Sequence, residues 1–155
     1  MGIFRFFVCL FLLLLSSASL PDDYQVSSGS DHSCAIDETG VVCWGGADNE
    51  FGQISVPVLS NPVQIVSGQS HVCTLDNSEV ICWGYNGSGQ TDVPTLSNPI
   101  SVSAGSHNTC ALSDAGVSCW GGSGSVNDVP NLSSPLAIDV GVAEACALEA
   151  SRVVC

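Results

Sequence analysis

Cysteine and histidine are the residues of this chain best suited to chemistry. Cys73 and Cys82 stand nine positions apart, His71 lies two positions before the first, and Trp83 follows the second. Thiolates and imidazoles bind zinc and react, so the pattern admits a metal site, a redox pair, a catalytic thiol or a structural disulfide. Zinc sites favour two to four residues between cysteine ligands and redox pairs favour C-x-x-C, so this spacing disfavours both.

The same arrangement occurs four times along the 155 residues, which identifies an internal repeat. The first cysteines of successive copies step by 39, 37 and 36 residues, and a glycine lies five positions before each of them. The units begin near Tyr24, Val63, Ile100 and Leu136. The four pairs are Cys34 with Cys43, Cys73 with Cys82, Cys110 with Cys119, and Cys146 with Cys155.

The sequence of each unit predicts three short antiparallel strands. A unit of four strands, with the fourth in the Gly-Gln/Val-Pro stretch, stays open as the alternative. The first strand alternates apolar and polar residues, as in Val63-Gln64-Ile65. The next two, "HVCTLD" and "VICWG" in the second unit, flank a short polar turn and are rich in β-branched residues, which is typical of a hairpin. No segment of the repeats has helical periodicity, so the predicted fold is all-β.

Folding each hairpin about its turn brings its two cysteines opposite one another. Directly opposed Cβ atoms are about 4.5–5.5 Å apart, close to the span of a disulfide. We therefore predict four disulfides within hairpins, each stabilising by about 2–3 kcal/mol. His32 and His71 precede their cysteines, but Asn108 and Glu144 take that place in the third and fourth units. We expect no metal, and hydrogen-bonding roles for both histidines.

Tryptophan follows the second cysteine in the first three units. Neighbouring residues of a strand point to opposite faces of the sheet, so the indoles and the disulfides lie on different faces. We predict that Trp44, Trp83 and Trp120 form a structural core by packing against the neighbouring unit. An exposed aromatic ligand surface is the alternative.

The N-terminal segment has the layout of a secretory signal. One basic residue is followed by an apolar run and then by small residues, which predicts a signal peptide over residues 1–19. An uncleaved anchor is the alternative, although the run is shorter than the roughly 20 residues of a membrane span. Cleavage removes Cys9 and leaves eight cysteines for an oxidising compartment. We expect a secreted, extracellular repeat domain over residues 20–155.

The net charge of the chain limits the classes of molecule that it can bind. It has 15 Asp and Glu residues, 2 basic residues and a formal net charge of −13. Arg152 is the only basic side chain after the predicted signal peptide, and there is no lysine. Binding to nucleic acid or to anionic lipid requires basic side chains, so we expect no nucleic-acid partner and no membrane binding by the mature chain.

The segments "SAGSHNTCALSDAGVSCWG" and "SGQSHVCTLDNSEVICWGYNGSGQTDVP" resemble the repeat of the regulator of chromosome condensation family. The resemblance implies blades of a seven-bladed β-propeller. The repeats are similar to secreted branches of the family, namely the propeller-type β-lactamase inhibitor of bacteria and the crinkly-type ectodomains of plant receptor kinases. The third unit lacks the Gly-Gln of the first two, so its loop is expected to differ.

The repeat region amounts to about 3.5 blades, whereas seven blades of this length need roughly 260 residues. The expected architecture is therefore a partial propeller. Three explanations stay open: a truncated gene model or fragment, association with further blades or another chain that closes the ring, and an open or smaller ring.

The expected function is extracellular protein binding without catalysis, because no set of nucleophile, base and acid stands out and no cofactor site is recognisable. The ligand is an unknown protein, and the loops that vary between units are the expected contact regions. Alternatives are a fragment of a receptor ectodomain, a secreted enzyme inhibitor and, by family analogy only, a regulator like a guanine-nucleotide exchange factor. Asn86 and Asn131 are sequon asparagines, with turn roles as the alternative. The candidate partner contacts are Asp48, Glu50, Phe51 and Tyr85.

Overall fold

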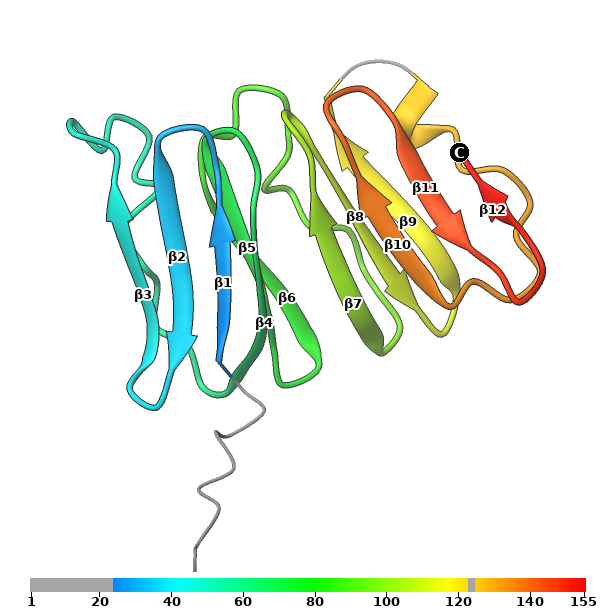
Figure 1. The fold of residues 1–155 in the computed structure, drawn as a ribbon, viewed down its shortest axis with the longest axis horizontal. Coiled ribbons are helices and arrows are strands. Elements are labelled where there is room, and N and C mark those ends of the chain that lie inside the picture. The colour runs from blue at the N-terminus through cyan, green and yellow to red at the C-terminus, as the bar shows by residue number, and fades with distance from the viewer. Residues whose placement is uncertain (1–23, 123–124) are drawn as a thin grey trace, which may run out of the picture.

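The structure is a computed structural model and describes residues 24–122 and 125–155, so the predicted signal peptide at residues 1–19 lies outside the described residues. The described chain folds into four three-stranded antiparallel sheets, and each sheet corresponds to one unit of the repeat. The sheets stand side by side in chain order (Figure 1), and successive sheets contact one another. The all-β repeat fold predicted from the sequence is confirmed.

The strand boundaries follow the sequence repeat. The described residues contain no helix that is long and apolar enough to cross a membrane. The first sheet comprises β1 (Gln25–Ser28), β2 (His32–Asp37) and β3 (Gly40–Gly45), and the second β4 (Pro62–Ser67), β5 (His71–Asp76) and β6 (Glu79–Gly84). The third comprises β7 (Pro99–Ala104), β8 (Asn108–Ser113) and β9 (Gly116–Gly121), followed by the 3₁₀ helix η1 (Ser125–Asn127), and the fourth β10 (Ala137–Val140), β11 (Ala145–Leu148) and β12 (Val153–Val154).

The stretches that connect the sheets form no strand within the described residues. Pro57 and Pro94 lie in two of these stretches, and proline has no main-chain N–H to donate to a sheet. Each unit therefore has three strands, and the fourth strand that the sequence left open does not form in the described residues.

Each hairpin brings its two cysteines into direct opposition. Cys73 of β5 faces Cys82 of β6, and the same register recurs in the first and third sheets. The Cα atoms of each pair are 4.0 or 4.1 Å apart, the short spacing of the closer kind of antiparallel pair. The four disulfides in the structure are Cys34–Cys43, Cys73–Cys82, Cys110–Cys119 and Cys146–Cys155.

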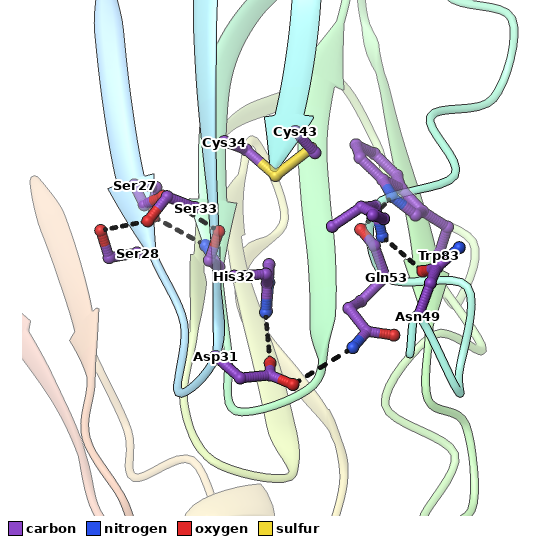
Figure 2. Close-up of a disulfide and its surroundings, with 12 residues drawn as sticks. Ser27, Ser28, Asp31, His32, Ser33, Cys34, Cys43, Asn49, Gln53 and Trp83 are labelled. Atoms are coloured by element: carbon purple, nitrogen blue, oxygen red, sulfur yellow. Dashed lines mark hydrogen bonds and ion pairs between the residues drawn. A yellow bond between two sulfur atoms is a disulfide. The ribbon is translucent and has the colours of Figure 1, made fainter. Parts of the chain in front are cut away.

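The second sheet is joined to the first by a tryptophan that packs on a disulfide. Trp83, at the end of β6, is 9% exposed and shares a core cluster with Cys34 and Cys43. Figure 2 shows its indole beside this bridge. The indole N–H donates a hydrogen bond of 3.0 Å to the main-chain carbonyl of Gln53 in the first unit. Both the apolar face and the polar edge of the ring therefore hold the two sheets together.

Trp120 repeats this arrangement one unit later. It packs with Cys73 and Cys82 of the second sheet, and its N–H donates to the carbonyl of Gln90 at 3.0 Å. Each of these tryptophans thus faces the preceding sheet, while the disulfide of its own sheet faces the following one. This matches the alternation along the strand that the sequence predicts.

Trp44 departs from the pattern. Its side chain is 49% exposed, and Val26 and Val42 on the same face of the first sheet are 71% and 46% exposed. Among the described residues, no sheet packs against that face. The prediction that Trp44 belongs to a core is therefore wrong for this structure, whereas Trp83 and Trp120 are buried.

Candidate functional site

The loop after β3 is held by its own amide side chains. The Oδ1 atom of Asn49 accepts a hydrogen bond from the main-chain N–H of Ile54 at 3.1 Å. The Oε1 atom of Gln53 accepts one from the N–H of Phe51, also at 3.1 Å. Side chains that bond to a turn's own backbone fix its shape. Phe51 is therefore presented on a defined turn, with 41% of its surface exposed.

The loop after β6 repeats this design. Asn86 Oδ1 accepts from the main-chain N–H of Thr91 at 3.0 Å, and Gln90 Oε1 accepts from the N–H of Ser88 at 2.9 Å. Gln90 is fully buried and Gln53 is almost fully buried. The two glutamines therefore anchor their turns to the interior of the protein. Tyr85 stands directly before the second turn, half-buried.

The third loop differs, as the loss of the Gly-Gln pair predicts. The described residues resume after β9 with η1, and Asn127 Nδ2 donates to the main-chain carbonyl of Gly121 at 2.9 Å. The sequence of this loop, "GGSGSVND", contains no aromatic residue. It therefore adds no ring to the surface formed by the first two loops.

Three rings from three successive units form a row on the loop side of the molecule, which we call the aromatic ladder: Phe51, Tyr85 and His107. The ring centroids of Phe51 and Tyr85 are 4.7 Å apart with an interplanar angle of 62°. Those of Tyr85 and His107 are 6.3 Å apart at 84°. Edge-to-face pairs of this kind are favourable for aromatic rings. The structure therefore brings the predicted contacts Phe51 and Tyr85 together.

His107 was not predicted from the sequence. It is exposed, and it occupies the repeat position held by Asp31 and Ser70 in the first two units. Its distance of two residues from Gly105 places it in the turn between the first two strands of its unit. That placement was the available signal, but a turn position alone does not reveal which ring of the neighbouring unit it meets.

A short polar chain orients the His107 ring. Ser106 Oγ donates to Gln69 Oε1 at 2.6 Å and lies 2.8 Å from His107 Nδ1. A hydroxyl has one proton, and the Gln69 oxygen can only accept, so the Nδ1–H of His107 donates to Ser106. The His107 ring is therefore oriented through its Nδ1 atom.

Carboxylates lie beside the ladder at the first unit. Asp48 and Glu50 are exposed on the turn that carries Phe51. The side chain of Asp31 is 53% exposed, and its two oxygens contact Gln53 Nε2 at 3.4 Å and His32 Nδ1 at 3.2 Å (Figure 2). We call these three carboxylates the acidic rim. The predicted contacts Asp48 and Glu50 thus share the loop of Phe51, although no direct bond joins them to the rings.

The two sequon asparagines differ in setting. Asn86 uses its amide nitrogen to donate to Asp92 Oδ1 at 2.8 Å, in addition to the turn bond of its oxygen. Asn86 therefore stabilises its turn, which is the structural role that the sequence analysis gave as the alternative to glycosylation. Asn131 is exposed in the stretch before β10. Glycosylation of either residue stays a prediction.

The two histidines before the cysteines are buried at the sheet interfaces. His71 is fully buried, and its Nε2 lies 2.9 Å from Thr109 Oγ1 of the third sheet. Burial, with the nearby positive charge of His32 and His107, lowers the pKa of His71 from 6.5 to about 4. At the repeat position of Thr109 the second unit has Val72, whose side chain offers no hydrogen-bonding group, and His32 bonds to Asp31 instead.

The chemistry of this surface suits recognition. Exposed rings offer stacking and cation–π contacts, and the rim offers carboxylate acceptors. All eight cysteines of the repeats are joined in disulfides, so none presents a thiolate. In residues 24–122 and 125–155, no three His, Cys, Asp or Glu side chains cluster as metal ligands would.

One family of known repeats matches part of this chain. Residues 24–53 match the Regulator of chromosome condensation (RCC1) repeat. No curated protein sequence matches the chain significantly.

Solved structures share the fold over most of the described chain. The entire ectodomain of the receptor kinase CR4 from Physcomitrella patens is 26% identical, with a TM-score of 0.68 over 83% of this chain and 38% of that one. The CRINKLY WD40 ectodomain of the receptor kinase ACR4 from Arabidopsis thaliana is 23% identical, with a TM-score of 0.64 over 83% of this chain and 46% of that one. Prp20p from Saccharomyces cerevisiae is 18% identical, with a TM-score of 0.64 over 81% of this chain and 43% of that one.

The four sheets are therefore blades of a β-propeller-type repeat protein. The first unit matches the regulator of chromosome condensation repeat, and the structural neighbours include crinkly receptor ectodomains, in line with the sequence resemblance. The chain spans less than half the length of each of these solved neighbours.

Proposed function

We propose that this protein is an extracellular protein-binding module whose contact surface is the aromatic ladder. The single observation that carries the proposal is the row of Phe51, Tyr85 and His107, which spans three blades and is built from loops rather than from the repeat core. Aromatic side chains are enriched at the centres of protein interfaces, where they supply much of the binding energy. The function proposed is binding rather than catalysis.

Two observations support an extracellular location. The four disulfides suit an oxidising compartment, and two of the structural neighbours are receptor-kinase ectodomains. The predicted signal peptide at residues 1–19 agrees with both. A role as part of a receptor ectodomain is the second candidate, and the likeness to the CR4 and ACR4 ectodomains favours it.

The charge around the ladder favours a cationic partner. The acidic rim flanks Phe51, and the whole chain has a formal net charge of −13. Arginine and lysine interact with aromatic faces through cation–π contacts and with carboxylates through charge-assisted hydrogen bonds. The partner we propose is therefore a protein segment with basic side chains.

The proposal is tested by binding of peptides to the immobilised, disulfide-bonded chain. Three peptide pools with equal aromatic content differ only in carrying Arg/Lys, Glu/Asp or Gln at the variable positions. We expect retention of the basic pool alone, with binding that weakens as salt is added.

Variants then locate the site. Phe51→Ala and Tyr85→Ala should each weaken binding of the basic pool at least tenfold, as expected for interface hot spots. Tyr24→Ala is the matched control, because Tyr24 is 46% exposed and bonds to Glu38 away from the ladder. Equal retention of the three pools, or undiminished binding by both ladder variants, would contradict the proposal.

A further inference from the structure

The turn after β6 contains an asparagine followed by a glycine, Asn86-Gly87, and both residues are exposed. In such a pair the main-chain nitrogen of the glycine can attack the side-chain carbonyl carbon of the asparagine, because glycine has no Cβ atom to hinder the approach. The pair is therefore a candidate site for deamidation, which is the conversion of the side-chain amide into a carboxylate.

The hydrogen bonds of the turn leave the attacking nitrogen available and polarise the carbon that it attacks. The main-chain N–H groups of Ser88, Gly89 and Thr91 donate the bonds that close the turn, and the N–H of Gly87 is not one of these donors. Thr91 donates to Asn86 Oδ1 at 3.0 Å. A donor at this oxygen stabilises the negative charge that develops on it during the attack.

The reaction requires only water as a further reactant. The Gly87 nitrogen forms a bond to Cγ of Asn86, and the bond from Cγ to Nδ2 breaks. Nδ2 leaves as ammonia with the proton that Gly87 gives up, and the product is a cyclic imide. Water then opens the ring at one of its two carbonyl groups. One opening gives aspartate, and the other gives isoaspartate, whose main chain runs through the side-chain carbon.

The turn after β3 is a matched case that lacks the glycine. Asn49 Oδ1 accepts from the main-chain N–H of Ile54 at 3.1 Å, and its Nδ2 donates to Ser55 Oγ at 2.9 Å. The next residue is Glu50, whose side chain hinders attack by its own main-chain nitrogen. The two turns therefore hold their asparagines by the same kinds of bond but differ in the residue that follows.

The two turns also differ in how they tolerate the product. Asn86 Nδ2 donates to Asp92 Oδ1 at 2.8 Å. A carboxylate in its place has no N–H to donate and is ionised at neutral pH, so it repels Asp92. The first turn has Ser55 where the second has Asp92, and a hydroxyl can rotate to donate to a carboxylate. Deamidation therefore opens the second turn, whereas the same change is compatible with the first.

Tyr85 is placed by the turn that contains Asn86. A Cβ atom added at Gly87 would collide with the hydroxyl oxygen of Tyr85, so the end of this ring lies directly on the Gly87 backbone. Tyr85 is the middle ring of the aromatic ladder, with centroid distances of 4.7 Å to Phe51 and 6.3 Å to His107. Displacement of Gly87 therefore removes the support of the ring that joins the other two.

We propose that Asn86 is a deamidation site, and that conversion of its amide to a carboxylate releases the turn that holds Tyr85 in the aromatic ladder. Hydrolysis of the imide does not restore the amide, so the change is a one-way chemical switch. The inference concerns the position of Tyr85 and does not depend on what the ladder binds.

The first test follows the amide by mass spectrometry. The full, disulfide-bonded chain is made in a host without N-glycosylation, incubated at neutral pH in heavy-oxygen water and digested in ordinary water. Chymotrypsin cleaves after Phe51 and Tyr85 and so separates the two asparagines. We expect heavy oxygen in the peptide with Asn86 and none in the peptide with Asn49. An Asn86 that keeps its amide, under conditions in which the reduced and unfolded chain loses it, overturns the proposal.

A variant transfers the reaction to the matched turn. Glu50→Gly places a glycine after Asn49, and we expect heavy oxygen to enter the Asn49 peptide of this chain as well. An Asn49 that stays an amide in the Glu50→Gly chain overturns the assignment of the reaction to the asparagine–glycine pair.

The second test follows the ring by fluorine NMR of the chain labelled with fluorotyrosine, in which Tyr24 and Tyr85 are the only tyrosines. Asn86→Asp reproduces the aspartate product and should move the Tyr85 signal while the Tyr24 signal stays in place. Asn49→Asp is the matched control and should move neither. Adding Asp92→Asn to Asn86→Asp restores a donor between the two side chains and should return the Tyr85 signal. An unmoved Tyr85 signal in Asn86→Asp, or equal shifts in the two single variants, overturns the proposal.

Discussion

The interface between the second and third sheets and the one between the third and fourth share a register but differ in side chains. At the first interface, the side chain of Trp120 packs on the Cys73–Cys82 disulfide and is 8% exposed. Its indole N–H donates a hydrogen bond to the preceding unit. At the second, Ala145 and Ala147 face a disulfide across a pocket of about 240 Å³. The comparison shows two interfaces of the same repeat that are filled to different extents: an indole covers the disulfide at one, and alanines leave a pocket beside the disulfide at the other.

The largest expected effect comes from removing the ring at the firm interface. Trp120→Ala should lower the free energy of unfolding by about 3–5 kcal/mol, because it deletes a buried aromatic side chain and leaves a cavity. Trp44→Ala is the matched control. Trp44 occupies the same repeat position but is 49% exposed, so its loss should cost less than half as much. Urea unfolding followed by circular dichroism measures both, and equal midpoints would contradict the comparison.

The second effect concerns pH at the same firm interface. The pKa of His71 is lowered to about 4 in the fold, mainly by burial, against 6.5 for an unperturbed histidine. Between these values the unfolded chain binds a proton that the folded chain does not, so stability must fall as pH falls through the window. The pKa difference corresponds to a loss of about 3 kcal/mol between pH 7 and pH 4.

Asn108 supplies the control for this prediction, because it replaces histidine at the same position of the third unit. A His71→Asn chain should lose most of the decline in stability between pH 6.5 and pH 4. Unfolding midpoints in urea at closely spaced pH values measure the slope. An unchanged slope in the variant would assign the pH dependence to another group.

The third effect separates two disulfides of equal loop length. Replacing Cys73 and Cys82 by alanine should lower stability by about 2–3 kcal/mol through loop entropy, and by more through the lost contact with Trp120. Replacing Cys146 and Cys155 removes an equal loop closure, but Cys155 is exposed and no indole packs on the bridge within the described residues. The second loss should therefore be smaller. A larger loss for the Cys146/Cys155 pair would sink this ranking.

The hairpins and their bridges could be predicted because they follow from local spacing. Cys73 and Cys82 are equidistant from a two-residue turn, and antiparallel register then places them opposite one another. The alternation of cysteine and tryptophan along β6 likewise fixed the face of Trp83. These features depend on one unit and its immediate neighbour, and the repeat presents them several times.

Features that depend on contacts between particular units were harder to predict. Trp44 and Trp83 hold the same position of the repeat, so the sequence does not distinguish them. Only the arrangement of the sheets shows that no sheet of the described residues covers the side of the first sheet on which Trp44 lies. His107 lies in a turn whose counterparts are not aromatic, so its contact with Tyr85 could not be inferred from the repeat. Phe51 and Tyr85 were found because their loops differ between units.

Native-state hydrogen exchange tests most directly whether the tryptophan on the disulfide holds each blade in place. Main-chain amides of β8, whose interface with the second sheet contains Trp120, should exchange much more slowly than those of β11, whose interface contains the pocket. In the Trp120→Ala chain, the amides of β8 should approach the exchange rates of β11. Equal protection of the two strands in the unaltered chain, or unchanged protection of β8 in the variant, would contradict the account.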